Sequence, residues 1–224
     1  MIETLLPPPV VTVHAFADLP GEAPHPGEED LVAKAVATRR QEFLTARRCA
    51  REALGKLGYA PGPIRSGPRR EPVWPAGVVG SITHCTGYRA AAVARHTDLA
   101  SLGIDAEPHE ALPDGLDAAV TVAGEPELLG RLAGSHPTVH WGRLLFSAKE
   151  SVYKAWYPVT GRWLGFEDAE LSIDPAGGFT ARLLVDGTRT DGGPPLTELP
   201  GRWLVDHGLI VTAVSVPPRA RHAP

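Results

Sequence analysis

Apolar residues recur with two different spacings along the chain, and each spacing predicts a different kind of element. Short runs rich in Val, Ile, Leu and Ala predict strands, which fall at residues 10–16, 78–83, 90–95, 100–107, 169–173, 179–184, 202–206 and 209–216. Longer stretches with apolar residues three or four positions apart predict helices. These cover residues 28–58, with a break near Thr38, residues 125–132, and residues 140–157, where Pro158 should end the helix.

The order of the predicted elements repeats once. A strand, a helical stretch and antiparallel strands come first, and the same order returns in the second half. This arrangement is typical of an α+β fold built from two similar halves. We expect a first half at residues 1–100 and a second at residues 101–224, with the break near residues 97–103. The 224 residues are enough to bury a substantial core.

The last predicted helix contains the run FSAKESVYKAW, Phe146 to Trp156. It places Lys149, Glu150 and Lys154 on neighbouring faces, and Glu150 and Lys154 stand four residues apart, where helical side chains meet. An exposed ion pair is the ordinary interpretation of such a spacing. A catalytic interpretation needs partners from elsewhere in the chain.

Two carboxylates in the strand at residues 100–107 supply such partners. The period of two puts Asp105 and Glu107 on one face, opposite Leu102 and Ile104. A solvated strand end would explain this pair alone. With Glu150 as a third carboxylate, the set fits Mg²⁺, which takes oxygen ligands from one or two carboxylates, water and phosphate. Mn²⁺ is possible at the same ligands.

Candidate phosphate ligands come from the first half. Thr83 and His84 precede a predicted turn at Thr86-Gly87, where a hydroxyl and a protonated imidazole could donate to phosphate oxygens. Arginine adds a planar fork that grips phosphate with two hydrogen bonds. Candidate arginines lie eight apart on one helix or cluster in a Gly/Pro-rich loop, as Arg39 and Arg47, Arg40 and Arg48, and Arg65, Arg69 and Arg70. A structural histidine and solvated basic faces are the ordinary alternatives.

Composition narrows the functional class. The net charge of −4 offers no global basic footprint for nucleic acid. Cys49 and Cys85 lack metal-ligand spacing and fit a reduced cytoplasmic pair. The N-terminus lacks the features of a signal peptide, and no apolar run approaches the ~20 residues of a membrane span. We therefore expect a cytoplasmic protein that binds neither nucleic acid nor membrane.

Three separated motifs, taken together, resemble the Sfp-type 4′-phosphopantetheinyl transferases, particularly the branch of siderophore-synthesis enzymes. They are WPAGVVGSITH at Trp74 to His84, GIDAE at Gly103 to Glu107, and FSAKESVYK at Phe146 to Lys154. The segment from Arg39 to Leu54 is similar to the N-terminal basic helix of that branch. Their order along the chain suits the family.

The resemblance implies an enzyme that transfers the 4′-phosphopantetheine arm of coenzyme A to a serine of an apo acyl, peptidyl or aryl carrier protein, releasing 3′,5′-ADP. It implies a pseudo-dimeric fold with coenzyme A in the cleft between the halves. Exposed apolar and basic residues near the cleft would receive the carrier protein. The pathway served stays open among fatty acid, polyketide, nonribosomal peptide and siderophore synthesis.

The resemblance also implies roles for individual residues. Asp105, Glu107 and Glu150 would hold Mg²⁺, and Glu150 is the candidate base for the serine hydroxyl. Lys154 would contact the pyrophosphate, with Lys149 as a second candidate. The remaining contacts to coenzyme A phosphates would come from Thr83, His84, Arg39, Arg40, Arg47, Arg48, Arg65, Arg69 and Arg70.

Two other functions compete with this one. A Mg²⁺-dependent nucleotide pyrophosphate hydrolase would need similar carboxylates and cations. A noncatalytic module that binds coenzyme A or a carrier would need only the arginines and His84. Because a pseudo-dimeric chain completes its own site, we expect a monomer.

Overall fold

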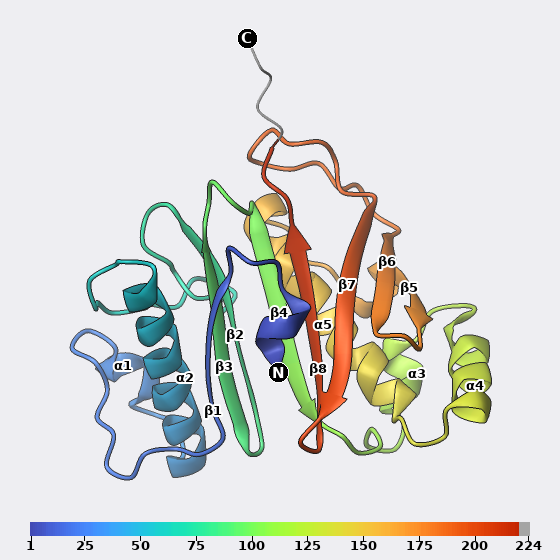
Figure 1. Ribbon diagram of the computed structural model, residues 1–224, viewed down its shortest axis with the longest axis horizontal. Coiled ribbons are helices and arrows are strands. Elements are labelled where there is room, and N and C mark those ends of the chain that lie inside the picture. Colours follow the sequence, from blue (N-terminus) through green and yellow to red (C-terminus); the bar gives the residue numbers. More distant parts are fainter. Residues whose placement is uncertain (220–224) are drawn as a thin grey trace.

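The first sheet is built from the N-terminal part of the chain in a computed structural model that describes residues 1–219. Its three antiparallel strands are β1 (Val11–Ala15), β2 (Val78–Cys85) and β3 (Tyr88–Arg95), in the order β1-β3-β2. The helix α2 (Ala37–Lys56) packs on this sheet through small apolar residues such as Ala50 and Ala53, which meet Val93 of β3. The short helix α1 (Glu29–Val32) precedes α2 (Figure 1).

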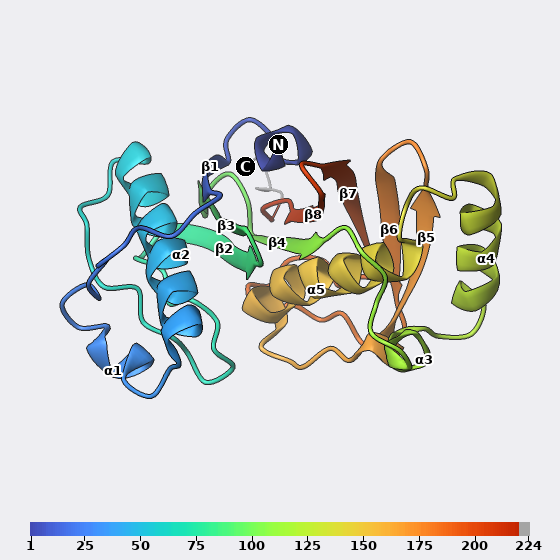
Figure 2. The ribbon, with the colours of Figure 1, turned by 90° about the horizontal axis from the view of Figure 1, so that it is seen from below.

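The second sheet has five antiparallel strands in the order β4-β8-β7-β6-β5. The strands are β4 (Ser101–Pro108), β5 (Ala169–Asp174), β6 (Gly178–Leu183), β7 (Glu198–Asp206) and β8 (Leu209–Val216). The helix α5 (Trp141–Thr160) runs along one face of the sheet, and α3 (Leu116–Val120) and α4 (Glu125–Ser135) lie beyond it toward β5 (Figure 2). The 3-10 helix η2 (Phe166–Asp168) leads into β5.

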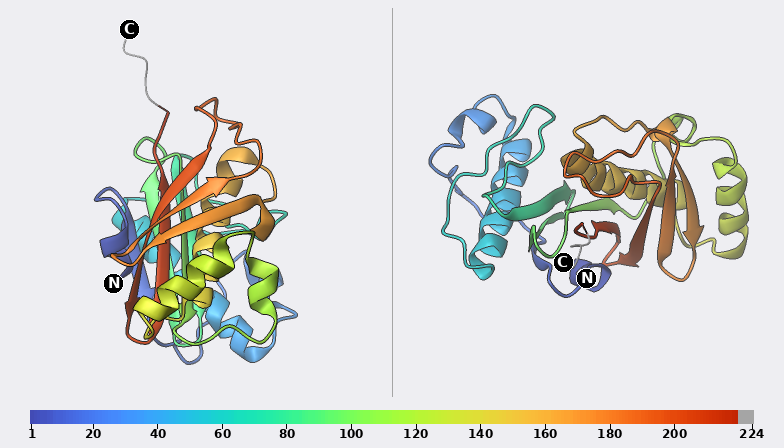
Figure 3. Two further views of the ribbon diagram at one scale, coloured as in Figure 1. Left: turned by 90° about the vertical axis from the view of Figure 1, so that its right-hand side faces the viewer. Right: turned by 90° about the horizontal axis from the view of Figure 1, so that it is seen from above.

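A third element closes the other face of the second sheet. The 3-10 helix η1 (Ile2–Leu5), next to the end marked N in Figure 3, contacts β7 and β8 and buries Ile2 and Leu5. The residues Leu102, Ile104 and Ala106 of β4 point into this same core. Asp105 therefore faces the opposite side, toward α5, as the period of two predicts.

The two sheets meet where β2 lies beside β4 (Figure 1). The strands belong to separate sheets, and side chains bridge them. The backbone N–H of Ile104 donates to the Ser81 hydroxyl at 3.1 Å, and that of Ala106 donates to the Thr83 hydroxyl at 3.1 Å. We call this contact the seam. It brings residues from both halves of the chain to one place.

A glycine allows α5 to lie close against β4. A Cβ added at Gly103 would stand 1.9 Å from the backbone oxygen of Ser151, which is far inside van der Waals contact. Since Glu150 and Lys154 flank this point, the missing side chain sets their distance from Asp105. The glycine thus has a packing role at the site rather than a turn role.

The structure corrects two predictions about helices. Pro158 lies inside α5, which continues to Thr160 and ends at Gly161, where φ is 67°. Proline removes the helical hydrogen bond to the backbone oxygen of Lys154, but the residues after it stay helical because Val159 is buried and Gly161 caps the end. The helix α3 was not predicted. A break in the first helical stretch is confirmed, but it falls at residues 33–36, and Thr38 lies inside α2.

The α+β class is confirmed by these two sheets and their helices. Each half packs a 20-residue helix on an antiparallel sheet. The domain boundary at residues 100 and 101 stays a prediction, although it falls between β3 and β4. Within residues 1–219, no helix has the length and apolar content needed to cross a membrane.

Candidate active site

A cleft of about 1140 Å³ lies between the two halves, and half of the predicted site residues line it. Its walls include Arg39, Phe43 and Arg47 of α2, His84 of β2, and Glu150, Tyr153, Lys154 and Tyr157 of α5. Figures 2 and 3 show α2 and α5 on the two sides of the seam. Most small-molecule sites enclose roughly 300–1,000 Å³, so this cleft suits a ligand of cofactor size.

Asp105 is buried behind the cleft wall and contacts Lys154, which lines the cleft. Its Oδ1 accepts hydrogen bonds from the Thr83 hydroxyl at 3.2 Å and from the Lys154 ammonium at 2.6 Å. Its Oδ2 is buried without a hydrogen-bond partner. A buried carboxylate oxygen with no partner is costly unless a ligand satisfies it.

The other two carboxylates are destabilised in the ligand-free protein. Burial and the nearby Asp105 charge raise the pKa of Glu107 to about 7, although the Arg143 guanidinium lies 3.0 Å from its Oε2. Burial also raises the pKa of Glu150, against the opposing effect of the Lys154 ammonium. Burial therefore disfavours the charged form of both carboxylates while no further cation is bound.

This chemistry fits a divalent cation, but the residues do not form a closed ligand shell. Within residues 1–219, no three His, Cys, Asp or Glu side chains are arranged to enclose a metal ion. Glu107 accepts a hydrogen bond from Arg143, which is one reason why the three carboxylates do not enclose a single point. Mg²⁺ needs only one or two carboxylates when water and substrate phosphate supply the rest. The free Asp105 Oδ2 and the two high-pKa carboxylates meet that requirement.

Lys149 does not reach the cleft. Its ammonium is buried in the second half, where it donates to Glu125 Oε2 at 2.8 Å and to the backbone oxygens of Val120 and Phe166 at 2.9 Å each. Successive residues of a helix point about 100° apart, so Lys149 and Glu150 meet different surroundings. The expected contact between Lys149 and pyrophosphate is not supported by this geometry.

His84 lies at the first-half side of the cleft and is uncharged in the ligand-free protein. Burial, together with the positive charges of Arg39, Lys154, Arg89 and Arg47, lowers its pKa to about 4. Arg39 Nη1 stands 2.7 Å from Nε2 of the ring. The expected protonated imidazole is therefore absent until an anion offsets these cations.

The structure sorts the seven candidate arginines into two groups. Arg39, Arg47, Arg69 and Arg70 line the cleft. Arg48 instead pairs with Glu22 and Glu52, Arg65 pairs with Asp30, and Arg40 lies outside the residues that line the cleft. Arg40, Arg48 and Arg65 are thus poorly placed for phosphate.

Arg47 is the best placed of the four for an anion. It is 5% exposed, its Nη2 donates to Ser66 at 3.1 Å, and its Nε is buried without a partner. Burial lowers its pKa to about 10, which leaves it charged at neutral pH. A buried guanidinium with a free donor beside a cleft favours a negatively charged ligand.

Sequence reasoning missed Arg143, and it expected Trp163 only as one of several candidates for the pantetheine tunnel or the docking surface, with core packing as the alternative. Arg143 holds Glu107 and also donates to the backbone oxygen of Ala111 at 2.7 Å, so it fixes the loop after β4. Trp163 is 60% exposed at the cleft mouth, where its ring stacks on Tyr153 and lies under the Arg69 guanidinium. Arg143 lies seven residues before Glu150 on α5, a spacing that places both on one side of the helix and could have indicated its role. Nothing in the sequence pairs Arg69 with Trp163.

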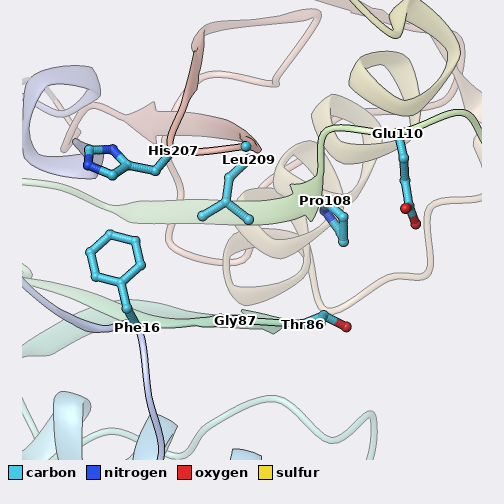
Figure 4. A pocket seen from close by; sticks show the side chains of 8 residues that line it. Phe16, Thr86, Gly87, Pro108, Glu110, His207 and Leu209 are labelled. Atoms are coloured by element: carbon cyan, nitrogen blue, oxygen red, sulfur yellow. The ribbon is translucent and has the colours of Figure 1, made fainter.

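A second, smaller cavity of about 230 Å³ lies at the ends of β4 and of the β7–β8 hairpin (Figure 4). Its walls include Phe16 and His207, whose ring centroids are 5.5 Å apart, with Pro108 and Leu209 alongside. None of the predicted site residues lines it. The larger cleft is therefore the candidate active site.

Comparison with known proteins gives one consistent family. Residues 27–94 match the 4′-phosphopantetheinyl transferase N-terminal domain, and residues 101–194 match the 4′-phosphopantetheinyl transferase superfamily. The 4′-phosphopantetheinyl transferase Svp of Streptomyces mobaraensis is 57% identical over 96% of this chain and 89% of its own. PptT of Mycobacterium tuberculosis, also named a 4′-phosphopantetheinyl transferase, is 48% identical over 96% of this chain and 97% of its own.

A more distant relative has a different name. Enterobactin synthase component D of Salmonella typhimurium is 34% identical over 86% of this chain and 79% of its own. The family matches fall on both sides of the seam, so both walls of the cleft belong to matched segments. The chain therefore belongs to the 4′-phosphopantetheinyl transferase superfamily, whose members transfer the phosphopantetheine arm of coenzyme A to carrier proteins.

Proposed function

We propose that this transferase depends on Mg²⁺ held by Asp105, Glu107 and Glu150, with coenzyme A bound across the seam. The observation that carries the proposal is the buried, unpartnered Oδ2 of Asp105 beside two carboxylates of raised pKa. A dication would favour the charged forms of both carboxylates and would also satisfy that oxygen. Mn²⁺ accepts the same oxygen ligands and should substitute.

The charges along the cleft support one orientation of coenzyme A. The 3′-phosphate would meet Arg39, Arg47 and His84 on the first half, where the unpartnered guanidinium nitrogen of Arg47 lies. The pyrophosphate would meet Lys154 and the carboxylate-bound cation on the second half. Arg69 and Arg70 would contribute at the mouth. This orientation uses the cations of both halves for one ligand.

The reaction then follows from positions and charge. The serine Oγ of the carrier attacks the β-phosphorus of coenzyme A, and the bond from that phosphorus to the bridging oxygen breaks. Glu150 takes the serine proton, a role that a raised pKa favours. Lys154 moves its hydrogen bonding from Asp105 toward the oxygens that gain charge. When bound, Mg²⁺ adds positive charge at the pyrophosphate oxygens and makes 3′,5′-ADP a better leaving group.

The carrier protein would dock at the cleft mouth. The exposed Trp163 and Arg69 stand there together, and a basic and aromatic rim suits an acidic helix on the partner. The names of its relatives suggest a carrier of siderophore or other secondary-metabolite synthesis. Because both walls come from one chain, the site is complete in a monomer. The free thiols of Cys49 and Cys85 suit a reducing cytoplasm, where coenzyme A is available.

One assay separates this function from its rivals. The protein is incubated with coenzyme A, Mg²⁺ and an apo carrier, and the carrier is weighed by intact mass spectrometry. A carrier that gains the phosphopantetheine arm supports transfer. Release of 3′,5′-ADP without a carrier would instead mean pyrophosphate hydrolysis, and binding without either product would mean a noncatalytic module. A panel of acyl, peptidyl and aryl carriers then identifies the preferred partner.

A further inference from the structure

Two hydroxyls of β2 cross the seam between the halves. Ser81 and Thr83 are two residues apart, so both point the same way from the strand, and they are 3% and 2% exposed. Each accepts one hydrogen bond from a backbone N–H of β4, Ser81 from Ile104 and Thr83 from Ala106. Both side chains therefore link β2 to β4 in the same way.

Thr83 differs from Ser81 because it also touches a carboxylate of the active site. Its hydroxyl donates to Asp105 Oδ1 at 3.2 Å. A threonine hydroxyl has a single proton. That proton is committed to Asp105, and one lone pair is committed to Ala106. Thr83 therefore has no donor left for a phosphate oxygen, contrary to the role expected from its place beside His84.

The two oxygens of Asp105 therefore have different surroundings. Thr83 from the first half and Lys154 from the second both donate to Oδ1, while Oδ2 stays buried and unpartnered. Two donors on one oxygen fix the rotation of the carboxylate and leave the other oxygen as its free end. The carboxylate is thus aimed by a residue from the opposite half of the molecule.

We propose that Thr83 is a positioning residue that orients Asp105 for the metal and links its orientation to the closure of the seam. The proposal rests on the metal role of Asp105 proposed above. Partners that orient a metal ligand typically change metal affinity or activity about 10- to 100-fold when removed. Thr83 acts through Asp105 and needs no contact with coenzyme A.

The test compares Thr83→Val, Thr83→Ser and Ser81→Ala in the full chain. Binding of Mn²⁺ in the presence of coenzyme A is measured by electron paramagnetic resonance, alongside kcat and KM for coenzyme A. Thr83→Val should weaken Mn²⁺ binding about 10-fold or more and lower kcat, with little change in KM. Thr83→Ser keeps the hydroxyl and should restore both. Ser81→Ala breaks a seam hydrogen bond without touching Asp105, so it should lower the Tm yet bind Mn²⁺ as the wild type does.

Asp105→Asn distinguishes a failure of the metal role of Asp105 from a failure of the positioning role of Thr83. If Asp105→Asn binds Mn²⁺ as tightly as the wild type, the metal assignment itself fails. If Asp105→Asn loses the metal while Thr83→Val binds it normally, Thr83 does not position Asp105. A raised KM with unchanged kcat in Thr83→Val would show a direct role on the phosphate and overturn the inference. Should Thr83→Val not fold, Thr83→Ala takes its place, with the same outcomes.

Discussion

Lys149 and Glu150 are neighbours in the chain but belong to different parts of the molecule. Glu150 borders the cleft, while the Lys149 ammonium is held by Glu125 and two backbone oxygens in the interior of the second half. Glu125 also accepts from the backbone N–H groups of Val122 and Leu171 at 2.8 Å each. The pair therefore joins α3, α4, α5 and β5 at one point.

This arrangement predicts that Lys149 serves stability. Replacing Lys149 by Met leaves the Glu125 carboxylate buried without its cation, and breaking such a pair from one side typically costs about 3–5 kcal/mol. Urea unfolding of Lys149→Met measures the loss. Lys154→Met is the comparison on the same helix. The Lys154 side chain is 26% exposed, whereas that of Lys149 is 2% exposed, so Lys154→Met should lose less stability while losing turnover. A Lys149→Met protein of normal stability with no turnover would restore the catalytic role expected from the sequence.

His84 gives a prediction about pH. Its pKa is about 4 in the folded protein and 6.5 in an unfolded chain. Between these values the unfolded chain binds the proton and the folded protein does not, so the free energy of unfolding falls as the pH is lowered from 6.5 to 4. The full effect amounts to at most about 3 kcal/mol.

His84→Gln isolates that contribution from the other titrating groups. Urea unfolding at several pH values between 4 and 7.5 should show the wild type losing stability relative to the variant as the pH falls through this window. Glu107, whose pKa is raised, acts in the opposite direction in both proteins and cancels in the comparison. A difference between the two proteins that does not change with pH would contradict the buried, neutral histidine.

Among the elements, β4 and α5 show which parts of the site follow from sequence. The period of two in β4 correctly separated Asp105 from the core residues Leu102 and Ile104, because burial of one face dictates the pattern. The helical period located Glu150 and Lys154 on α5. Neither period reports on contacts between distant segments. The partners Thr83, Arg143 and Glu125 therefore emerged only from the packing of separate elements.

The close approach of α5 to β4 predicts a large effect for Gly103→Ala. The added Cβ would meet the Ser151 backbone oxygen at 1.9 Å and the Ala155 backbone nitrogen at 2.7 Å, so α5 must move away from β4. Overpacking of a tight core commonly costs about 1–3 kcal/mol and sometimes more. We expect a lower Tm and, since Lys154 moves with the helix, weaker Mn²⁺ binding.

Gly130→Ala is the matched control for this prediction. Gly130 is an exposed residue inside α4, and a Cβ there would meet nothing within 4 Å. Alanine in a helix interior is favoured over glycine by roughly 0.5–1 kcal/mol. Gly130→Ala should therefore raise the Tm slightly. An unaltered Tm in Gly103→Ala would mean that the helix does not lie as close to the strand as described.

At the scale of the whole molecule, the site exists only where the halves meet. The first half supplies Arg39, Arg47 and His84, and the second supplies Asp105, Glu150 and Lys154. A ligand that contacts both groups must also stabilise the seam between the halves. Coenzyme A with Mg²⁺ should raise the free energy of unfolding with the logarithm of its concentration, by about 2.7 kcal/mol at 100 times the dissociation constant, and the Tm should rise with it.

Dephospho-coenzyme A tests the contribution of the first half to this stabilisation. It lacks the 3′-phosphate, so it should raise the Tm less than coenzyme A at the same concentration. The difference should shrink in Arg47→Met, because that variant lacks the buried guanidinium proposed to meet the 3′-phosphate. Equal shifts with the two ligands in the wild type would place the 3′-phosphate outside the cluster of Arg39, Arg47 and His84.

The central claim is that the free oxygen of Asp105 holds the metal that coenzyme A needs. The most direct measurement is a crystal structure of the protein with coenzyme A and Mn²⁺, in which anomalous scattering locates the metal. The account predicts an anomalous peak bonded to Asp105 Oδ2, with Thr83 still donating to Oδ1 and the pyrophosphate completing the shell. A metal bound away from Asp105, or a pyrophosphate held by arginines without any metal, would contradict it.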